Sequence, residues 1–286
     1  MDAILQVEHL TKRYPNFTLE DVSFSLPKGT VMGLIGENGA GKSTTLHALL
    51  DLIHKDGGSV TFWGQPLSAS RQIREDIGIV LDDVNFYATL TPQQVGRILR
   101  AAYRQWDDAA YSAYLTRFGL PLRQEIQSLS KGMRMKLLIA AALSHKPKLL
   151  ILDEATSGLD PVMRDEILDV FWDFVQDEEH AILLSSHITT DLERIADTIT
   201  FLHQGRLVFC KPKDELLYRY GILRCGQADF ARIDKEDILA CRREDYQWSV
   251  LVADKEAARR KYRPQVLDDA TIDDILLLYV KGEQNR

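Results

Sequence analysis

The stretch VMGLIGENGAGKSTTLHALL, residues 31–50, passes from an apolar run through a glycine-rich loop into a segment with helical spacing. Three glycines let the loop backbone curl, so that successive N–H groups converge on one anion. The positive end of the following helix strengthens the attraction for that anion. A loop of this kind between a strand and a helix predicts a phosphate-binding site.

Two side chains in this loop carry specific chemistry. The Lys42 ammonium would reach the β- and γ-phosphates of a nucleotide, and the Ser43 hydroxyl would offer an oxygen to Mg²⁺. The alternative is a glycine-rich turn without a ligand, which the fixed spacing and the flanking strand and helix argue against. We expect the nucleotide to contact the whole loop, which consists of Gly36, Glu37, Asn38, Gly39, Ala40, Gly41, Lys42, Ser43 and Thr44.

A second site follows the apolar run LLIL at residues 149–152, which ends at Asp153 and Glu154. In a parallel sheet, this end of a strand lies at the edge where ligands bind. We expect Asp153 to anchor the hydration shell of Mg²⁺ and Glu154 to polarise the water that attacks the γ-phosphate. Taken alone, the segment also fits a strand followed by a solvated acidic turn. The phosphate loop favours the catalytic interpretation.

The remaining segments differ in character. Short alternating runs separated by proline and glycine predict antiparallel strands within residues 1–35. Further along, apolar strands alternate with amphipathic helices, whereas residues 91–144 have helical spacing throughout. The predicted fold class is α/β, with a P-loop NTPase core, an antiparallel β subdomain and a helical insertion, plus a small C-terminal α/β accessory domain.

We place the domain boundary before residue 214, where the alternation of strands and helices restarts on a smaller scale. Residues 1–213 are the predicted ATPase domain, with its helical subdomain at about residues 82–145. Residues 214–286 are the predicted accessory domain, whose last helix has Thr271 as its expected N-cap.

The run LSKGM, residues 129–133, lies some twenty residues before the acidic strand end and resembles the signature motif of the ATP-binding-cassette (ABC) ATPases, commonly LSGGQ. The resemblance covers roughly residues 3–210, with several motifs in the family's order. It implies that Ser130 and Gly132 meet the γ-phosphate of a nucleotide. Considered alone, Ser130 also fits an ordinary helix cap.

Three further residues match family positions. Asp160 in SGLD, residues 157–160, resembles the loop that crosses between two subunits, although this sequence also fits a common turn. His187 resembles the switch histidine that contacts the γ-phosphate, and its place at a predicted sheet edge favours that role over a structural one. Tyr14 matches the aromatic residue that stacks on adenine, and a tyrosine at the end of a strand is the alternative.

Three positions depart from the family pattern. Lys131 and Met133 replace the glycine and the glutamine of the commonest signature. Asp82 ends the run IGIVLD, residues 77–82, where the family usually has a glutamine that senses Mg²⁺ and the attacking water. Aspartate is shorter than glutamine and is charged, which leaves three interpretations open. Asp82 binds Mg²⁺ in a closed state of the protein, it is too short to reach the ion, or it is a residue of a surface turn. We keep Asp82 as a candidate Mg²⁺ ligand.

A phosphate loop alone leaves one side of the γ-phosphate open to water, where electrostatic stabilisation is weak. The resemblance implies that a second ABC ATPase subunit, either a copy or a different chain, closes this side. It also implies a separate transmembrane permease, for which Phe86, Tyr87 and Leu90 are candidate contacts. Core packing is the alternative for each of the three, and for any one of them it is the more common role. Within the family, the run LSKGM and the segment ATIDDI, residues 270–275, resemble ABC-2-type exporter ATPases. The transported substrate cannot be read from this chain, because the permease recognises it.

Composition restricts the possible functions further. The 286 residues include 35 basic and 42 acidic side chains, a formal charge of −7, which argues against a nucleic-acid-coating role. No apolar run approaches the roughly 20 residues that cross a bilayer, and no secretory signal is evident. We therefore expect a cytoplasmic protein that lies peripherally on the inner face of the cell membrane. Three cysteines without metal-ligand spacing predict neither a disulfide framework nor a zinc site.

Two other functions remain open from the sequence. A soluble ABC protein that acts on ribosomes or DNA usually has two cassettes or a long coiled coil, and neither is found here. A nucleotide-binding subunit with poor catalysis would fit the departures at Asp82 and Met133. GTPase chemistry is disfavoured because no NKxD guanine-reading motif is present.

Overall fold

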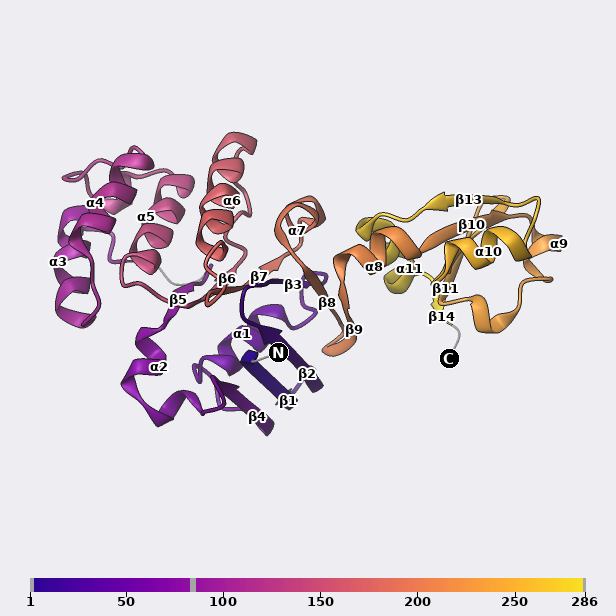
Figure 1. The fold of residues 1–286 in the computed structure, drawn as a ribbon, viewed down its shortest axis with the longest axis horizontal. Helices are drawn as coiled ribbons and strands as arrows, with labels where there is room; N and C mark the ends of the chain where they lie inside the picture. The colour runs from indigo at the N-terminus through magenta and orange to yellow at the C-terminus, as the bar shows by residue number, and fades with distance from the viewer. Residues whose placement is uncertain (1–2, 83–85, 285–286) are drawn as a thin grey trace. The chain divides into compact units, whose positions relative to one another are not determined.

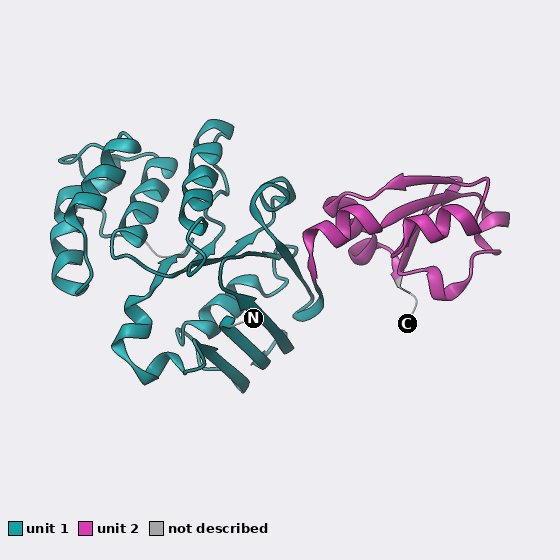
Figure 2. Cartoon of the chain, in the orientation of Figure 1, with its two compact units in different colours: residues 1–210 teal, residues 211–286 magenta. Residues whose placement is uncertain are grey.

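The structure, a computed structural model, describes residues 3–82 and 86–284. The chain forms two compact units, residues 1–210 and residues 211–286 (Figure 2). This division lies three residues before the boundary expected after residue 213. Each unit has its own sheet and its own buried apolar cluster, so we describe each by itself.

The first unit is built on a six-stranded sheet with the strand order β5-β6-β7-β3-β8-β9 (Figure 1). Strand β3 pairs in parallel with β7 and β8, and β6 pairs in parallel with β5 and β7. Every residue of β3, β6 and β7 is buried, as expected for strands that are covered on both faces. The strands are β3 (Val31–Ile35), β5 (Ile77–Val80), β6 (Leu149–Asp153), β7 (Ala181–Ser186), β8 (Thr198–His203) and β9 (Arg206–Pro212).

A three-stranded antiparallel sheet forms the second layer of this unit. Strand β1 (Ala3–Tyr14) pairs with β2 (Phe17–Pro27) on one side and with β4 (Gly57–Phe62) on the other. Apolar side chains of this sheet share one buried cluster with β3 and helix α1, so the two sheets stabilise each other around the phosphate loop. The predicted fold class is confirmed, although β4 is missing from the sequence prediction.

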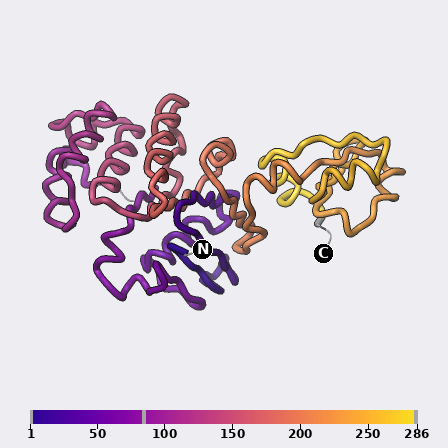
Figure 3. The backbone as a smooth tube through the Cα atoms, viewed as in Figure 1, coloured from indigo at the N-terminus to yellow at the C-terminus, as the bar shows by residue number. Residues whose placement is uncertain are grey.

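Between β5 and β6 the chain leaves the sheet, runs through α3, α4 and α5, and returns, as the tube in Figure 3 shows. These helices are the expected insertion, and each has the N-cap that its sequence supplies: Thr91, Asp107 and Ser130. The helices of the unit are α1 (Lys42–Leu49), α2 (Arg71–Glu75), α3 (Pro92–Ala102), α4 (Asp108–Arg117), α5 (Lys131–Leu143), α6 (Pro161–Val175) and α7 (Thr189–Ile195).

The second unit has an antiparallel sheet with the order β13-β10-β12-β11-β14. Thr271 caps its last helix through a capping box with Asp274, as expected from the sequence. Its strands are β10 (Gly221–Cys225), β11 (Ala240–Glu244), β12 (Gln247–Val252), β13 (Val266–Asp269) and β14 (Glu283–Gln284). Its helices are α8 (Lys213–Arg219), α9 (Gln227–Phe230), α10 (Lys255–Lys261) and α11 (Ile272–Lys281).

The three cysteines carry free thiols, and two of them, Cys225 and Cys241, are buried in the second unit. Burial raises the pKa of both thiols, which keeps them protonated near neutral pH. Within residues 3–82 and 86–284, no helix has the length and apolar character needed to traverse a bilayer.

Candidate functional site

The phosphate loop lies between β3 and α1, and two of its positions require glycine for different reasons. A Cβ on Gly36 would lie 2.4 Å from the carbonyl oxygen of Leu202. Gly41 has a left-handed backbone with φ 110°, and a Cβ there would lie 3.0 Å from Phe17 Cζ and from Leu19 Cδ1. Glycine is therefore required at both positions, once for close approach and once for conformation.

The Lys42 ammonium is held inside this loop, and the residue is only 6 % exposed. Its Nζ donates to the carbonyl oxygen of Gly36 at 2.8 Å and to that of Glu37 at 3.3 Å. Glu154 Oε1 lies 3.6 Å from the same nitrogen. A buried positive charge needs such partners, and phosphate oxygens in the loop would compete for the same N–H groups.

The two acidic residues at the end of β6 have different surroundings. Asp153 is 3 % exposed, and one of its carboxylate oxygens accepts a hydrogen bond from the Ser185 hydroxyl on neighbouring β7. Glu154 has a positive φ of 51°, a conformation that is uncommon outside glycine. Its N–H donates to the Ser185 carbonyl oxygen at 3.1 Å and lies 3.3 Å from the hydroxyl. The backbone at Glu154 thus departs from the extended conformation of β6 while remaining bonded to β7.

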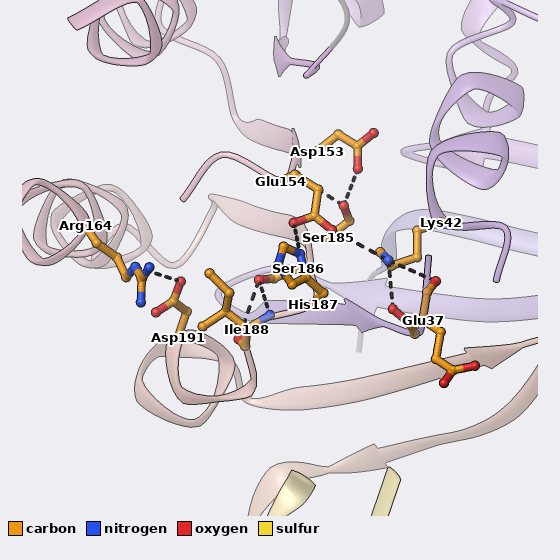
Figure 4. A network of polar contacts seen from close by, with 11 residues as sticks. Glu37, Lys42, Asp153, Glu154, Arg164, Ser185, Ser186, His187, Ile188 and Asp191 are labelled. Atoms are coloured by element: carbon orange, nitrogen blue, oxygen red, sulfur yellow. Dashed lines mark hydrogen bonds and ion pairs between the residues drawn. The ribbon is translucent and has the colours of Figure 1, made fainter. Parts of the chain in front are cut away.

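The Glu154 carboxylate lies between a lysine and a histidine. Oε1 faces Lys42, while Oε2 lies 2.6 Å from His187 Nδ1 (Figure 4). Because Nδ1 is engaged by the carboxylate, Nε2 is the ring nitrogen left to contact a substrate oxygen. The three residues come from α1, from the end of β6 and from the end of β7, so the parallel sheet brings together positions far apart in sequence.

The loop that carries His187 is anchored on its other side. The Ile188 N–H donates to the Ser186 hydroxyl at 2.9 Å. This hydrogen bond closes a tight turn around His187. Beyond it, Asp191 of α7 lies 3.9 Å from Arg164 of α6, as Figure 4 shows. These contacts fix the start of α7 and thereby the place of the imidazole.

A cleft of about 540 Å³ opens in front of these groups, a size typical of small-ligand sites. Asp82 lines it together with Glu154 and His187, so the structure brings this departure from the family pattern to the site. The other lining residues are Phe17, Glu37, Asn38, Gly39, Gly41, Lys42, Ser43, Thr44 and Ser157.

Tyr14 is not among the residues that line this cleft. It lies at the end of β1, is 41 % exposed, and has the Lys12 ammonium 5.4 Å from its ring centre. The aromatic residue on the cleft is Phe17, which pairs with Tyr14 across the β1–β2 hairpin. Either ring is available to a base that extends from the phosphate loop, and Phe17 lies next to Gly41 of the loop itself.

The signature residues and Asp160 are likewise not among the residues that line this cleft; they begin two helices. The Ser130 hydroxyl accepts from the Met133 N–H at 3.2 Å and caps α5. The Asp160 carboxylate accepts from the first N–H groups of α6 at 3.1 and 3.0 Å. A Cβ on Gly132 would lie 2.4 Å from Met163 Sδ of α6, so the starts of the two helices are in contact.

The residues present suit a Mg²⁺ ion that is bound mainly through a nucleotide. The exposed Ser43 hydroxyl and the Asp153 carboxylate are hard oxygen donors, which Mg²⁺ prefers. Within the described part of the chain, no group of three or more His, Cys, Asp or Glu side chains could hold a metal. The ion would therefore depend on phosphate and water oxygens for most of its ligands.

Two residues of the site are missing from the sequence prediction. Ser185 bonds Asp153 across the sheet, and Phe17 lines the cleft. Ser157 also lines the cleft, and it belongs to the SGLD segment, in which the sequence prediction named only Asp160 as a site residue. Ser185 could have been found from the register of two strands that both end at the ligand edge, because Asp153 and Ser185 are directly paired. The sequence carries no comparable signal for Phe17.

Comparison with known proteins supports this geometry. A family model described as ABC transporter matches residues 19–157. The linearmycin resistance ATP-binding protein LnrL of Bacillus subtilis is 31 % identical, and the alignment covers 98 % of this chain and 94 % of that protein. The lantibiotic transport ATP-binding protein SrtF of Streptococcus pyogenes is 35 % identical, with 74 % of this chain and 92 % of that protein covered.

A solved structure described as the ATP-binding subunit of an ABC transporter is also similar. It superposes with a TM-score of 0.68 at 31 % identity, covering 74 % of this chain and 91 % of that one. The likeness to LnrL extends over nearly the whole chain, so the second unit is part of it.

Proposed function

The chain belongs to the family of ABC transporter ATP-binding proteins, and from that premise we propose that ATP closes two copies of it and that hydrolysis reopens them to drive export through a separate membrane permease. As a member of this family, the chain binds ATP and hydrolyses it. The observation that carries the mechanism is the line of charged groups Lys42, Glu154 and His187 at the phosphate loop.

Each of these groups has a distinct task in hydrolysis. The loop N–H groups and Lys42 hold the β- and γ-phosphates and offset their charge. Glu154 accepts a proton from the water that attacks the γ-phosphate, and it is held in place by its backbone bonds to Ser185. His187 donates toward a γ-phosphate oxygen through Nε2 while Glu154 holds Nδ1.

A divalent ion completes the proposed site. When bound between Ser43, Asp153 and the phosphates, Mg²⁺ would neutralise charge on the transferring phosphoryl group. The Ser185 hydroxyl engages one oxygen of Asp153 and so fixes the orientation of this carboxylate. Asp82 lies on the cleft and is a further candidate ligand.

The second side of the γ-phosphate would be closed by the start of α5 of a partner chain. Ser130 caps that helix with its side chain, and the helix N-terminus is electropositive. Because each chain carries both the phosphate loop and this helix, two copies can supply both sides of two identical sites. A γ-phosphate that touches both chains favours the closed dimer, and its hydrolysis removes that preference.

Relatives whose names include lantibiotic transport support the proposal that this chain powers an exporter. We place it at the cytoplasmic face of the cell membrane, bound to a permease through the segment that follows Asp82. Of this segment, residues 83–85 lie outside the described residues. We also propose residues 1–213 as the ABC ATPase domain, with the helical subdomain at about residues 82–145, and residues 214–286 as an accessory domain.

Replacement of Tyr87 by glutamate tests the permease contact. Phe86 and Leu90 are half-buried, but Tyr87 is 84 % exposed, so a charge there spares the fold. We expect Tyr87→Glu to keep the ATPase rate of the purified protein within about twofold while the membrane-bound fraction falls at least about tenfold, because a charge in an apolar contact must be desolvated. Cell fractionation with immunodetection measures the bound fraction.

Tyr246 supplies the matched control, since it is 97 % exposed and lies in the second unit. We expect Tyr246→Glu to remain on membranes. Equal membrane association of both variants would count against Tyr87 as a permease contact without touching the ATPase assignment.

A further inference from the structure

Arg164 and Asp191 face each other from two helices, but the hydrogen bond between them is not made. Arg164 lies near the start of α6, and Asp191 lies in the first turn of α7. Arg164 Nε is 3.9 Å from Asp191 Oδ2 (Figure 4), whereas a charge-assisted N–H···O bond measures about 2.7–2.9 Å. Among the described residues, neither of these two atoms has a hydrogen-bond partner, and both are buried.

An unmade bond of this kind is unusual for a buried carboxylate. Asp191 is only 3 % exposed, so bulk water does not replace the missing partner of Oδ2. Burial of a charged oxygen without a hydrogen bond costs free energy, and native proteins leave few such groups. A displacement of about 1 Å would bring the guanidinium within bonding distance. The pair is therefore one small movement away from a closed and more stable arrangement.

The pair connects the SGLD segment with the loop that carries His187. Arg164 Nη2 donates to the carbonyl oxygen of Leu159, within the SGLD segment, at 3.4 Å. Asp191 follows His187 by four positions. A change in the separation of Arg164 from Asp191 therefore moves the SGLD segment and the histidine loop relative to each other.

The start of α7 lacks the side-chain cap that would fix it locally. Its N-cap residue, Ile188, has no side chain that could accept from the first N–H groups of the helix. Asp191 occupies the third helical position, where an acidic side chain often bonds back to the N-cap N–H. That N–H donates instead to the Ser186 hydroxyl. The Asp191 carboxylate is thus left to face Arg164.

We propose that Arg164 and Asp191 are positioning residues for hydrolysis, whose ion pair closes when ATP is bound and sets His187 Nε2 against the γ-phosphate. This inference rests on the proposed function, in which Nε2 donates toward the γ-phosphate while Glu154 holds Nδ1. Neither Arg164 nor Asp191 is among the residues that line the cleft, so each acts through the histidine. A misplacement of about 1 Å can slow a reaction by roughly 10²-fold, so closure of this gap has a measurable effect.

Ordinary packing of α7 on α6 is the competing explanation. The same two helices are already joined at the surface, where Arg194 of α7 pairs with Asp165 and Asp169 of α6. Arg194 Nη2 lies 2.6 Å from Asp169 Oδ1, so this bond is fully made. One substitution can therefore be compared at two carboxylates of the same helix pair, one that is bonded at the surface and one that is buried and open.

Asp191→Asn keeps the size of the side chain and removes its charge, whereas Asp191→Glu keeps the charge and adds a methylene group. We expect Asp191→Asn to lower kcat for ATP hydrolysis at least about tenfold with KM within about threefold, because the phosphate loop still binds the nucleotide. Asp191→Glu should stay within about threefold in both constants, because it can still pair with Arg164. Steady-state phosphate release by the full chain measures both constants, and a thermal melt measures the folded fraction.

Asp169→Asn is the matched control, because it makes the same substitution in the bonded pair between the same helices. We expect it to keep both constants within about twofold. A packing role for Asp191 would show itself differently, as a fall in kcat that only follows the loss of folded protein. That result would overturn the proposal.

A His187→Ala background shows whether Asp191 acts through the histidine. We expect Asp191→Asn to lower kcat less than about twofold further once the imidazole is gone, because residues that act as one unit are not additive. A full additional loss in that background, or an unchanged kcat in the single variant, would overturn the role of Asp191. If His187→Ala alone leaves kcat unchanged, the proposed task of His187 fails first, and the positioning role fails with it.

Discussion

Glu154→Gln should lower the rate of ATP hydrolysis by about 10²–10⁴-fold while ATP affinity stays within about threefold. The amide has the size of the carboxylate but cannot accept a proton from the attacking water, and general-base catalysis typically contributes a factor of this order. Binding should persist because the phosphates are held by the loop N–H groups and by Lys42, which also donates to two backbone carbonyls. Phosphate release and nucleotide titration measure the two quantities separately.

Glu179→Gln is a suitable control for this result. Glu179 pairs with Lys28 at the surface, and neither residue is among those that line the cleft. We expect this variant to hydrolyse ATP at the original rate. If Glu154→Gln retains more than a tenth of the activity, Glu154 is not the base, and a water positioned by another group must be considered.

Lys42→Met should reduce nucleotide affinity by about 10²-fold or more and abolish measurable hydrolysis. The ammonium would form charge-assisted hydrogen bonds with two phosphates, each worth roughly 1.5–3 kcal/mol. The methionine also leaves Glu154 without its cationic neighbour at 3.6 Å. Isothermal titration with ATP and with ADP measures the loss, and a thermal melt checks that the loop still folds.

Glu154→Gln should bind ATP without hydrolysing it, whereas Lys42→Met should lose both nucleotide binding and hydrolysis. This difference makes the prediction specific to each residue. Lys55→Met serves as the control, since Lys55 pairs with Asp51 and is not among the residues that line the cleft. Nucleotide affinity of Lys42→Met within about threefold of the original would contradict the proposed phosphate contact.

Local sequence patterns predict the framework of this fold well. The apolar run before the phosphate loop forms strand β3, and helices α3, α4 and α5 all lie within residues 91–144, where helical spacing predicts them. The prediction succeeds because each of these elements is determined by its own periodicity and caps, such as Thr91 and Asp107. The phosphate loop is likewise a local motif with a local backbone requirement.

What the sequence does not predict depends on contacts between distant segments. Strand β4 contains two glycines, and it forms because it pairs with β1. The bond from Ser185 to Asp153 follows from the pairing of β6 with β7. Phe17 reaches the cleft through the β1–β2 hairpin, and the sequence pointed instead to its cross-strand partner Tyr14. No local pattern contains this information.

The helix caps show a further limit of reading residues one at a time. Ser130 and Asp160 both match family positions, and both also satisfy the backbone N–H groups of α5 and α6. The structural role and the proposed functional role are compatible, because a capped helix start is a preorganised site for an anion. Substitutions at either residue would change both roles together.

The claim on which this account depends is that the γ-phosphate joins two copies of the chain. Light scattering with size-exclusion chromatography on the Glu154→Gln protein tests it most directly, with saturating Mg²⁺ and either ATP or ADP in the column buffer. The account predicts the mass of two chains with ATP and of one chain with ADP. The same mass with both nucleotides, whether of one chain or of two, would contradict it.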